Sequence, residues 1–172
     1  MNPIERRSAF TLASVMSLRM LGLFMVLPLF SLYAHQLLGA TPALIGFSLG
    51  IYGLTQAVFQ IPFGAWSDKF GRKKMITLGL FIFILGSMVC ACTHTIHGMI
   101  IGRALQGAGA VGSTIIALLA DLTRENQRSK AMAIIGMTIG MSFSLAMLLG
   151  PLLNTWLQVN GIFWLASAMG IF

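Results

Sequence analysis

The chain has 172 residues, of which 57% are apolar and 9% are charged, and its mean hydropathy is +0.88. Soluble domains are only about 45–50% apolar, so this composition excludes an ordinary soluble domain and indicates an integral membrane protein. The formal net charge is +7. A charge of this size could indicate a nucleic-acid partner, and the positions of the basic residues decide whether it does.

Five segments are long enough to cross the membrane as helices, which takes roughly 20 apolar residues. They cover about residues 8–35, 42–66, 75–93, 98–121 and 131–153, and a sixth apolar segment at 161–172 is too short to cross. None shows the period-2 alternation of outer-membrane strands, so we predict an all-α membrane protein. We expect an uncleaved first helix and a sequence cut short within a sixth span.

The Lys and Arg residues outside the spans all lie on one side of the predicted membrane. The opposite connections carry none of them. By the positive-inside rule we place the N-terminus in the cytoplasm, and this topology together with anionic lipid headgroups accounts for the net charge without nucleic acid. These nine bases are Arg6, Arg7, Lys69, Arg72, Lys73, Lys74, Arg124, Arg128 and Lys130.

The sequence shows no pattern typical of an enzyme or a metal site. Cys90 and Cys92 are two residues apart in a predicted helix and therefore point to different faces. His94 and His97 flank an outer turn, where solvated loop residues are the first interpretation and proton handling is the alternative. Without a catalytic triad, paired carboxylates or a phosphate loop, we expect no enzyme activity, no cofactor and no metal.

The connection between the second and third spans gathers charges and glycines. It carries glycine at 64 and 71, one acid, and a series of bases, in the pattern G-x-x-x-D-[RK]-x-G-[RK]-[RK]. An ordinary positive-inside loop explains the bases but neither the acid nor the spaced glycines. Glycine at 64 would allow close helix approach, and glycine at 71 would allow a positive φ in a tight turn. The specified positions are Gly64, Asp68, Lys69, Gly71, Arg72 and Lys73.

Two bases lie inside the predicted spans. Arg103 stands in "GRALQGAGA" with Gln106 and Gly107, and Arg19 lies about 16 Å along the first helix from Ser8. A charge in a span usually faces the bundle interior or a wet cavity. Snorkelling to the headgroups is the alternative. On a continuous fourth helix, Arg103 and Asp121 would share one face at its opposite ends.

A polar stripe and a Gly-Pro pair mark two other spans. Tyr52, Gln56 and Gln60 recur at every fourth residue of the second span, where they either bond helix to helix or line a substrate path. Gly150 and Pro151 end the fifth span, and a proline there kinks or stops the helix. We predict that this pair is a hinge.

The loop pattern and the R-x-x-Q-G-x-G pattern of the fourth span both resemble signatures of the major facilitator superfamily. Stretches such as "SLRMLGLFMVLP" and "LADLTREN" make the chain most similar to the YajR-like group of bacterial inner-membrane drug/proton antiporters. The resemblance implies twelve helices in two halves around a cavity lined in this half by helices 1, 2, 4 and 5. It implies alternating access, drug efflux by proton exchange, and the N-terminal half of such a carrier. Ala146, Asn154 and Thr155 depart from the family's antiporter signature around the Gly-Pro pair.

Proton coupling has weak support in this part of the sequence. The four acids, Glu5, Asp68, Asp121 and Glu125, all lie at helix ends or in cytoplasmic segments, whereas an antiporter needs a titratable group in the membrane. The carrier acid then belongs to the missing C-terminal half, or transport is uniport. A non-transporting sensor or scaffold with the same fold is the rival class, which the sequence beyond Phe172 would decide.

Asp68 and Arg72 are four residues apart and can pair on one helix face. Asp121 reaches the same level at the end of the fourth span. The resemblance implies that this loop closes the cytoplasmic side in the outward-open state. We therefore expect Asp68, Arg72 and Asp121 to form a conformational latch.

Overall fold

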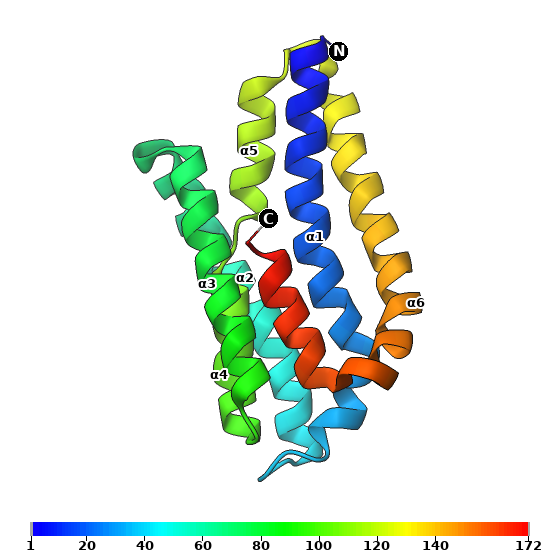
Figure 1. The fold of residues 1–172 in the computed structure, drawn as a ribbon. Coiled ribbons are helices and arrows are strands. Elements are labelled where there is room, and N and C mark those ends of the chain that lie inside the picture. Colours follow the sequence, from blue (N-terminus) through cyan, green and yellow to red (C-terminus); the bar gives the residue numbers. More distant parts are fainter. Residues whose placement is uncertain (1, 172) are drawn as a thin grey trace.

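The computed structural model describes residues 2–171, and these residues are almost entirely helical (Figure 1). Thr41 and Thr95 cap the helices that follow them by accepting hydrogen bonds from Leu44 N at 3.3 Å and Gly98 N at 3.2 Å. The helices are α1 (Pro3–Ala34), α2 (Pro42–Phe70), α3 (Arg72–Cys92), α4 (Ile96–Ala108), α5 (Gly112–Leu122) and α6 (Arg128–Met169), with a short 3-10 helix, η1 (Glu125–Gln127).

Five stretches of the described residues are long and apolar enough to cross a membrane, which confirms the predicted all-α membrane fold. The N-terminus, the α2–α3 connection and the α5–α6 connection lie at one end of the bundle (Figure 1). We call this the N-terminal end. The nine bases outside the spans predicted from the sequence lie in these segments or in the adjoining ends of the helices. The stretches are Pro3–Phe30, Pro42–Phe70, Arg72–Cys92, Ile96–Leu122 and Glu125–Asn154.

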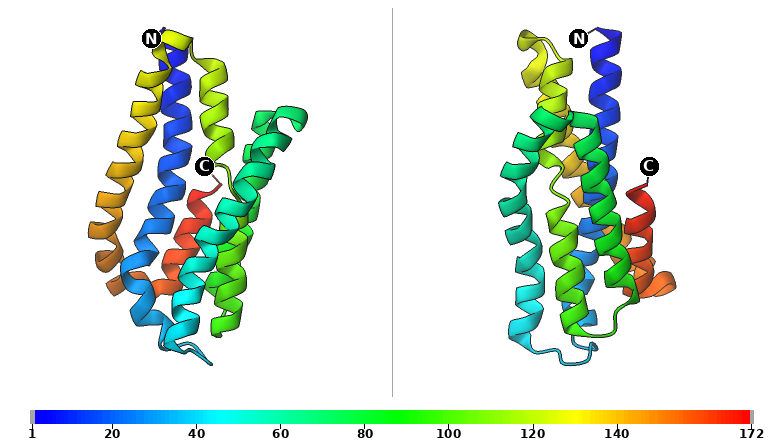
Figure 2. Two further views of the ribbon diagram at one scale, coloured as in Figure 1. Left: turned by 180° about the vertical axis from the view of Figure 1, so that it is seen from behind. Right: turned by 90° about the vertical axis from the view of Figure 1, so that its left-hand side faces the viewer.

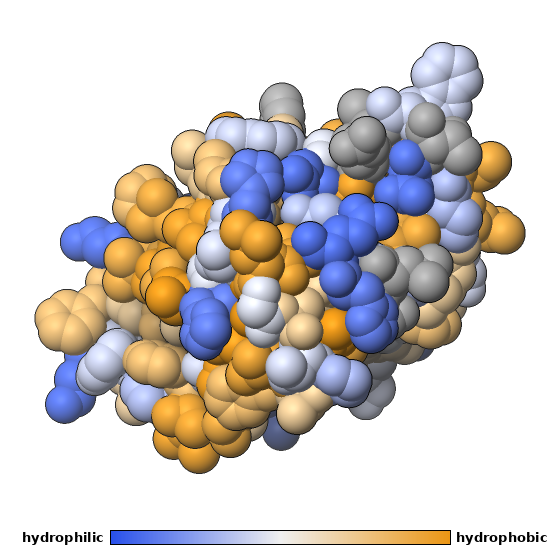
Figure 3. Space-filling view, turned by 90° about the horizontal axis from the view of Figure 1, so that it is seen from below, coloured by the Kyte–Doolittle hydropathy of each residue, from blue (hydrophilic) through white to orange (hydrophobic). Residues whose placement is uncertain are grey.

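The opposite end carries the connections from α1 to α2 and from α3 to α4. An isolated bridge between Leu38 and Thr95 joins them, and neither connection contains Lys or Arg. Seen from this side, hydrophilic residues are mixed with apolar ones (Figure 3). The bases are therefore segregated to the N-terminal end, as the sequence predicts.

The predicted fourth span differs from the structure because it is interrupted. A break at residues 109–111 separates α4 from α5. There Ala110 N and Val111 N donate to carbonyl oxygens only two residues back, at 2.8 and 2.9 Å, instead of continuing the helical ladder. A side chain at Gly109 would collide with the Gly79 carbonyl oxygen, so the chain at the break packs closely against α3.

The predicted fifth span and the start of the sixth form one helix in the structure. α6 runs without interruption from Arg128 to Met169 and contains Pro151. It bends sharply in its last third, and its final part turns back beside α1 and ends part-way along the bundle (Figure 2). Buried Val159, Ile162 and Phe163 in this last part explain the return, because they pack against the same core as Met25 and Phe30 of α1.

The helices leave one large face unpartnered. In the spans of α2 and of the first part of α6, only 17% of the residues are buried, against 56% in the span of α1. Gly46, Gly50 and Gly53 of α2 and Gly136 and Gly140 of α6 have no atom within 4 Å of the position a Cβ would take. In a membrane, rows of small residues are typical of helix packing surfaces.

Candidate functional site

Three helices meet through one arginine at the N-terminal end. Arg72, the first residue of α3, pairs through Nη1 with Asp68 Oδ1 of α2 at 2.6 Å and through Nε with Asp121 Oδ2 of α5 at 3.0 Å. Its Nη1 also donates to Ser67 Oγ at 2.7 Å. The Arg72 side chain is 22% exposed, whereas Asp68 and Asp121 are 62% and 54% exposed. The structure thus brings together the three residues of the expected latch.

Glycines shape this connection. Gly71 alone separates α2 from α3 and has a φ of +98°, in the region that favours glycine. Ser113 Oγ lies 3.7 Å from the Cβ position of Gly64, and that hydroxyl donates to the Gln60 carbonyl oxygen at 3.0 Å, so α2 and α5 pack closely here. Lys69 and Lys73 are exposed, and neither takes part in an ion pair among the residues that the structure describes.

A third ion pair at the same end was not anticipated from the sequence. The Glu5 carboxylate of α1 accepts a hydrogen bond from Arg124 Nε at 2.8 Å. This bond and the charge of Glu5 raise the pKa of the Arg124 guanidinium above its usual value. Asn2 and Glu5 form a capping box around Pro3, and that N-x-x-E pattern was the signal available in the sequence.

Arg103 lies inside the bundle rather than at its surface. Its guanidinium carbon is 5.4 Å from the centre of the Phe30 ring and 5.2 Å from that of Tyr52, and the side chain is 1% exposed. Nη1 donates to Gln106 Oε1 at 3.2 Å, and Gln106 Nε2 donates to Ser87 Oγ at 2.8 Å. Stacking and hydrogen bonds to neutral groups thus hold this cation away from the headgroups.

Arg19 is equally enclosed. It is 1% exposed, lies 5.3 Å from the centre of the Phe83 ring, and donates from Nη2 to the Gly109 carbonyl oxygen at 3.0 Å. Its Nε and Nη1 have no hydrogen-bond partner among the described residues. The guanidinium therefore sits at the break between α4 and α5 and binds the carboxyl end of α4, where a cation is favoured.

The polar stripe of α2 begins beside the buried Arg103 and ends on the unpartnered face. Tyr52 and Gln56 are half-buried and Gln60 is exposed. The Tyr52 hydroxyl is buried without a hydrogen-bond partner within the described part of the chain. Because the Tyr52 ring also covers Arg103, it separates that arginine from the unpartnered face.

The Gly-Pro pair lies within α6, which continues past it. A Cβ at Gly150 would stand 2.8 Å from the Met25 carbonyl oxygen, so glycine allows α6 to approach α1 here. Pro151 is exposed. Arg103 lies on α4 and Asp121 on α5, so the continuous fourth helix on which the two were expected to share a face is not present.

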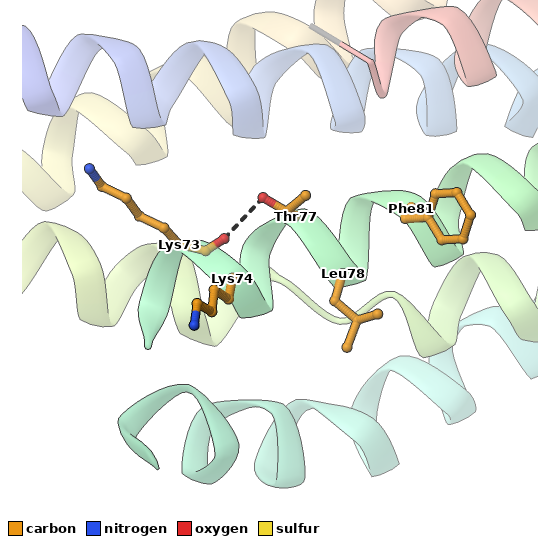
Figure 4. A pocket seen from close by; sticks show the side chains of 5 residues that line it. All are labelled: Lys73, Lys74, Thr77, Leu78 and Phe81. Carbon is orange, nitrogen blue, oxygen red and sulfur yellow. Dashed lines mark hydrogen bonds between the residues drawn. The ribbon is translucent and has the colours of Figure 1, made fainter. Parts of the chain in front are cut away.

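Two hollows lie near the N-terminal end. The larger, of about 510 Å³, is on the face of α3 that carries Lys73, Lys74, Thr77, Leu78 and Phe81 (Figure 4). The other, of about 250 Å³, is bordered by parts of α1, α3 and α5, including Arg7 and Thr11. Neither is lined by the buried arginines or by the Arg72 ion pairs.

The amino-acid sequence matches a known protein family. A family model described as the Major Facilitator Superfamily matches residues 12–172. The inner membrane transport protein YajR of Escherichia coli is 53% identical over 169 residues, which are 98% of this chain and 37% of YajR. Multidrug resistance protein 2 of Bacillus subtilis is 28% identical over 97% of this chain and 42% of its own length.

A solved structure has the same helical arrangement. The human organic anion transporter MFSD10 superimposes with a TM-score of 0.80 at 23% identity, over 99% of this chain and 47% of the human chain. At this identity the similarity concerns the fold. The chain spans less than half the length of each of these proteins.

Proposed function

Because this chain belongs to the Major Facilitator Superfamily, we propose that it is the N-terminal half of a secondary transporter. The whole protein exports small molecules, drugs among them, in exchange for protons across a bacterial inner membrane. The 53% identity with an inner membrane transport protein supports the location. Relatives named as multidrug resistance proteins, at 28–32% identity, support the substrate class.

The observation that carries the proposal is the position of Arg72. Its two ion pairs tie the ends of α2, α3 and α5 together at one end of the bundle. Both acids are more than half exposed, so each pair can form and break in water at a small free-energy difference, about 0–1 kcal/mol for such pairs. A network of this strength suits a latch that opens and closes in each transport cycle, since a stronger one would hold a single state. The last turns of α2, the turn itself and the first turn of α3 complete the proposed latch with Gly64, Lys69, Gly71 and Lys73.

The segregated bases support an orientation. Since the connections rich in Lys and Arg lie at the N-terminal end, we place that end in the cytoplasm. The latch then closes the cytoplasmic side in the outward-open state.

The unpartnered face supports a second half. The open faces of α2 and α6, with their rows of glycine, would pack against a second helical bundle. Such a bundle would enclose a substrate path along Tyr52, Gln56 and Gln60, with Arg19, Arg103 and Gln106 behind it and Gly150–Pro151 as a hinge. Proton exchange then needs a titratable group in the other half, because the four acids of this chain lie at the N-terminal end.

The proposal is tested with the whole protein in inside-out membrane vesicles. Respiration acidifies the vesicle interior, and acridine orange fluorescence reports the pH difference. We then add ethidium, chloramphenicol and benzoate in turn, a cation, a neutral compound and an anion. Proton-coupled export predicts that at least one compound discharges the pH difference in vesicles with the wild-type protein and not with Arg72→Ala.

Two alternatives have their own outcomes. A uniporter would move a radiolabelled compound without changing the pH difference. A sensor or scaffold would do neither for any of the three compounds, and that result would contradict the proposal.

A further inference from the structure

The ion pair of Glu5 and Arg124 differs in kind from the ion pairs of the latch. The Glu5 side chain is 8% exposed and the Arg124 side chain 57% exposed, and the Glu5 carboxylate accepts four hydrogen bonds from two residues. Arg124 provides three of them, from Nε at 2.8 Å, the backbone N at 3.2 Å and Nη2 at 3.3 Å. The fourth comes from Asn2 N at 2.6 Å. All four hydrogen bonds to the Glu5 carboxylate thus come from Asn2 and Arg124.

Such a pair cannot open at small cost. Separating Arg124 from Glu5 would break three of the four hydrogen bonds to this carboxylate at once, which costs more than breaking one contact between a base and an exposed acid. Asp68 and Asp121, in contrast, can each exchange Arg72 for water because they are more than half exposed. One end of the bundle therefore holds a durable pair beside two labile ones.

The Glu5–Arg124 pair includes a residue close in the sequence to Asp121, one of the two acids that pair with Arg72. Arg124 lies three residues after Asp121, just beyond the end of α5. Thr123 between them is buried, so this short segment is packed rather than free. The Glu5–Arg124 pair thereby holds the segment that carries Asp121 against the first turn of α1.

We propose that Glu5 and Arg124 form a permanent anchor that positions Asp121 for Arg72 in both states of the transport cycle. The anchor keeps the ends of α1 and α5 together while the contacts of Arg72 form and break. Glu5 and Arg124 are thus positioning residues and do not contact substrate. This inference rests on the proposed function for the existence of the two states.

The test measures two distances in the whole protein, in a background without reactive cysteines. Spin labels at exposed positions 6 and 126 report the anchor, through Arg6→Cys and Asn126→Cys. Labels at 69 and 126, through Lys69→Cys and Asn126→Cys, report the latch. Pulsed electron paramagnetic resonance compares the labelled proteins with and without Asp68→Asn; the two labelled at 69 and 126 both lack the Lys69 side chain, which takes no part in the ion pairs of Arg72. We expect the 69–126 distance to lengthen and the 6–126 distance to stay narrow and unchanged.

Glu5→Gln supplies the second arm. This variant should broaden the distribution of the 6–126 distance and shift the 69–126 distance towards the value in Asp68→Asn. It should also lower the turnover rate about fivefold or more with little change in KM. Arg124→Lys, which keeps the charge, should retain most of the narrow distribution. Arg124→Gln replaces Glu5→Gln if that variant fails to insert. Glu125→Gln, an exposed acid next to Arg124, is the matched control and should change nothing.

The outcomes separate the two claims. A 6–126 distance that lengthens in Asp68→Asn as much as the 69–126 distance would overturn the anchor. So would a narrow 6–126 distance in Glu5→Gln with a normal 69–126 distribution. If Asp68→Asn leaves the 69–126 distance unchanged, the proposed latch is refuted instead. The 6–126 distance in Glu5→Gln then tests the anchor by itself.

Discussion

Arg19 of α1 donates a hydrogen bond to the carbonyl oxygen of Gly109 at 3.0 Å, across 90 positions of the sequence. This bond joins the first membrane span to the break in the fourth. The Gly109 carbonyl oxygen accepts one hydrogen bond from Val111 N at 2.9 Å and a second from Arg19, so its hydrogen bonds are satisfied within the membrane despite the break. A cation at the carboxyl end of a half-helix also opposes the negative end of its dipole. The buried arginine therefore stabilises the break in the helix, and the break provides the carbonyl oxygen that binds the arginine.

We expect Arg19→Met to separate stability from transport. The change removes a hydrogen bond from a charged donor, worth about 1.5–3 kcal/mol, but the Gly109 carbonyl oxygen keeps Val111 N as a donor at 2.9 Å. The change also removes a buried cation that has no acid partner among the described residues, and such a burial costs several kcal/mol. The unfolding temperature in detergent should therefore stay equal or rise, while transport falls. A less stable variant that still transports would show that Arg19 holds the fold and serves no other purpose.

Arg103→Ala should reduce transport by about tenfold or more with membrane insertion intact. The substitution removes the cation stacked on Phe30 and Tyr52 and frees Gln106 from its partner. Initial rates in vesicles, normalised to the amount of inserted protein, measure the effect. Arg103→Lys keeps the charge but loses the planar stacking, and it should be impaired as well. Normal rates in both variants would exclude a role in transport.

Gly86→Ala should destabilise the protein by about 1–3 kcal/mol, as overpacking does. A Cβ at Gly86 would lie 2.5 Å from Gln106 N and 2.7 Å from the Gly102 carbonyl oxygen, so α3 and α4 would have to separate. Thermal unfolding of the purified 172-residue chain in detergent measures the loss. The matched control is Gly53→Ala, which meets no atom within 4 Å. Equal stability of the two variants would contradict the close packing of α3 on α4.

The 172-residue chain by itself should not transport. Its α2 and α6 leave one face open, so it encloses only one side of a substrate path. Reconstituted in vesicles, it should give no saturable flux of a compound that the whole protein carries. Saturable flux would point to a carrier made of two copies of this chain.

The sequence predicted an all-α fold with apolar spans, the gathering of the bases outside the spans at one end and the pairing of Arg72 with Asp68, because each follows from local rules. Apolar length defines a span, Gly71 permits the tight turn, and the spacing of Asp68 and Arg72 places them on one helix face. The contact of Arg72 with Asp121, 49 positions away, was expected only because both span ends reach the same side of the membrane. The break at Gly109 could not be predicted in this way. It depends on the carbonyl of Gly79 and on Arg19, which are distant in the sequence. The partnership of Glu5 with Arg124, 119 positions apart, was hidden for the same reason.

The most direct test of the latch is the accessibility of the open face from the cytoplasmic side. A cysteine introduced by Ala57→Cys on the exposed face of α2 is labelled with a membrane-impermeant maleimide in inside-out vesicles that contain the whole protein. Breaking the latch by Asp68→Asn should raise the labelling rate about two- to fivefold, as the loss of one exposed ion pair worth up to about 1 kcal/mol allows, and should slow turnover. Lys74→Ala, an exposed base outside these ion pairs, should leave both unchanged. If labelling and turnover in Asp68→Asn equal those of the wild type, Arg72 and its two acids are only a topology signal and the latch does not exist.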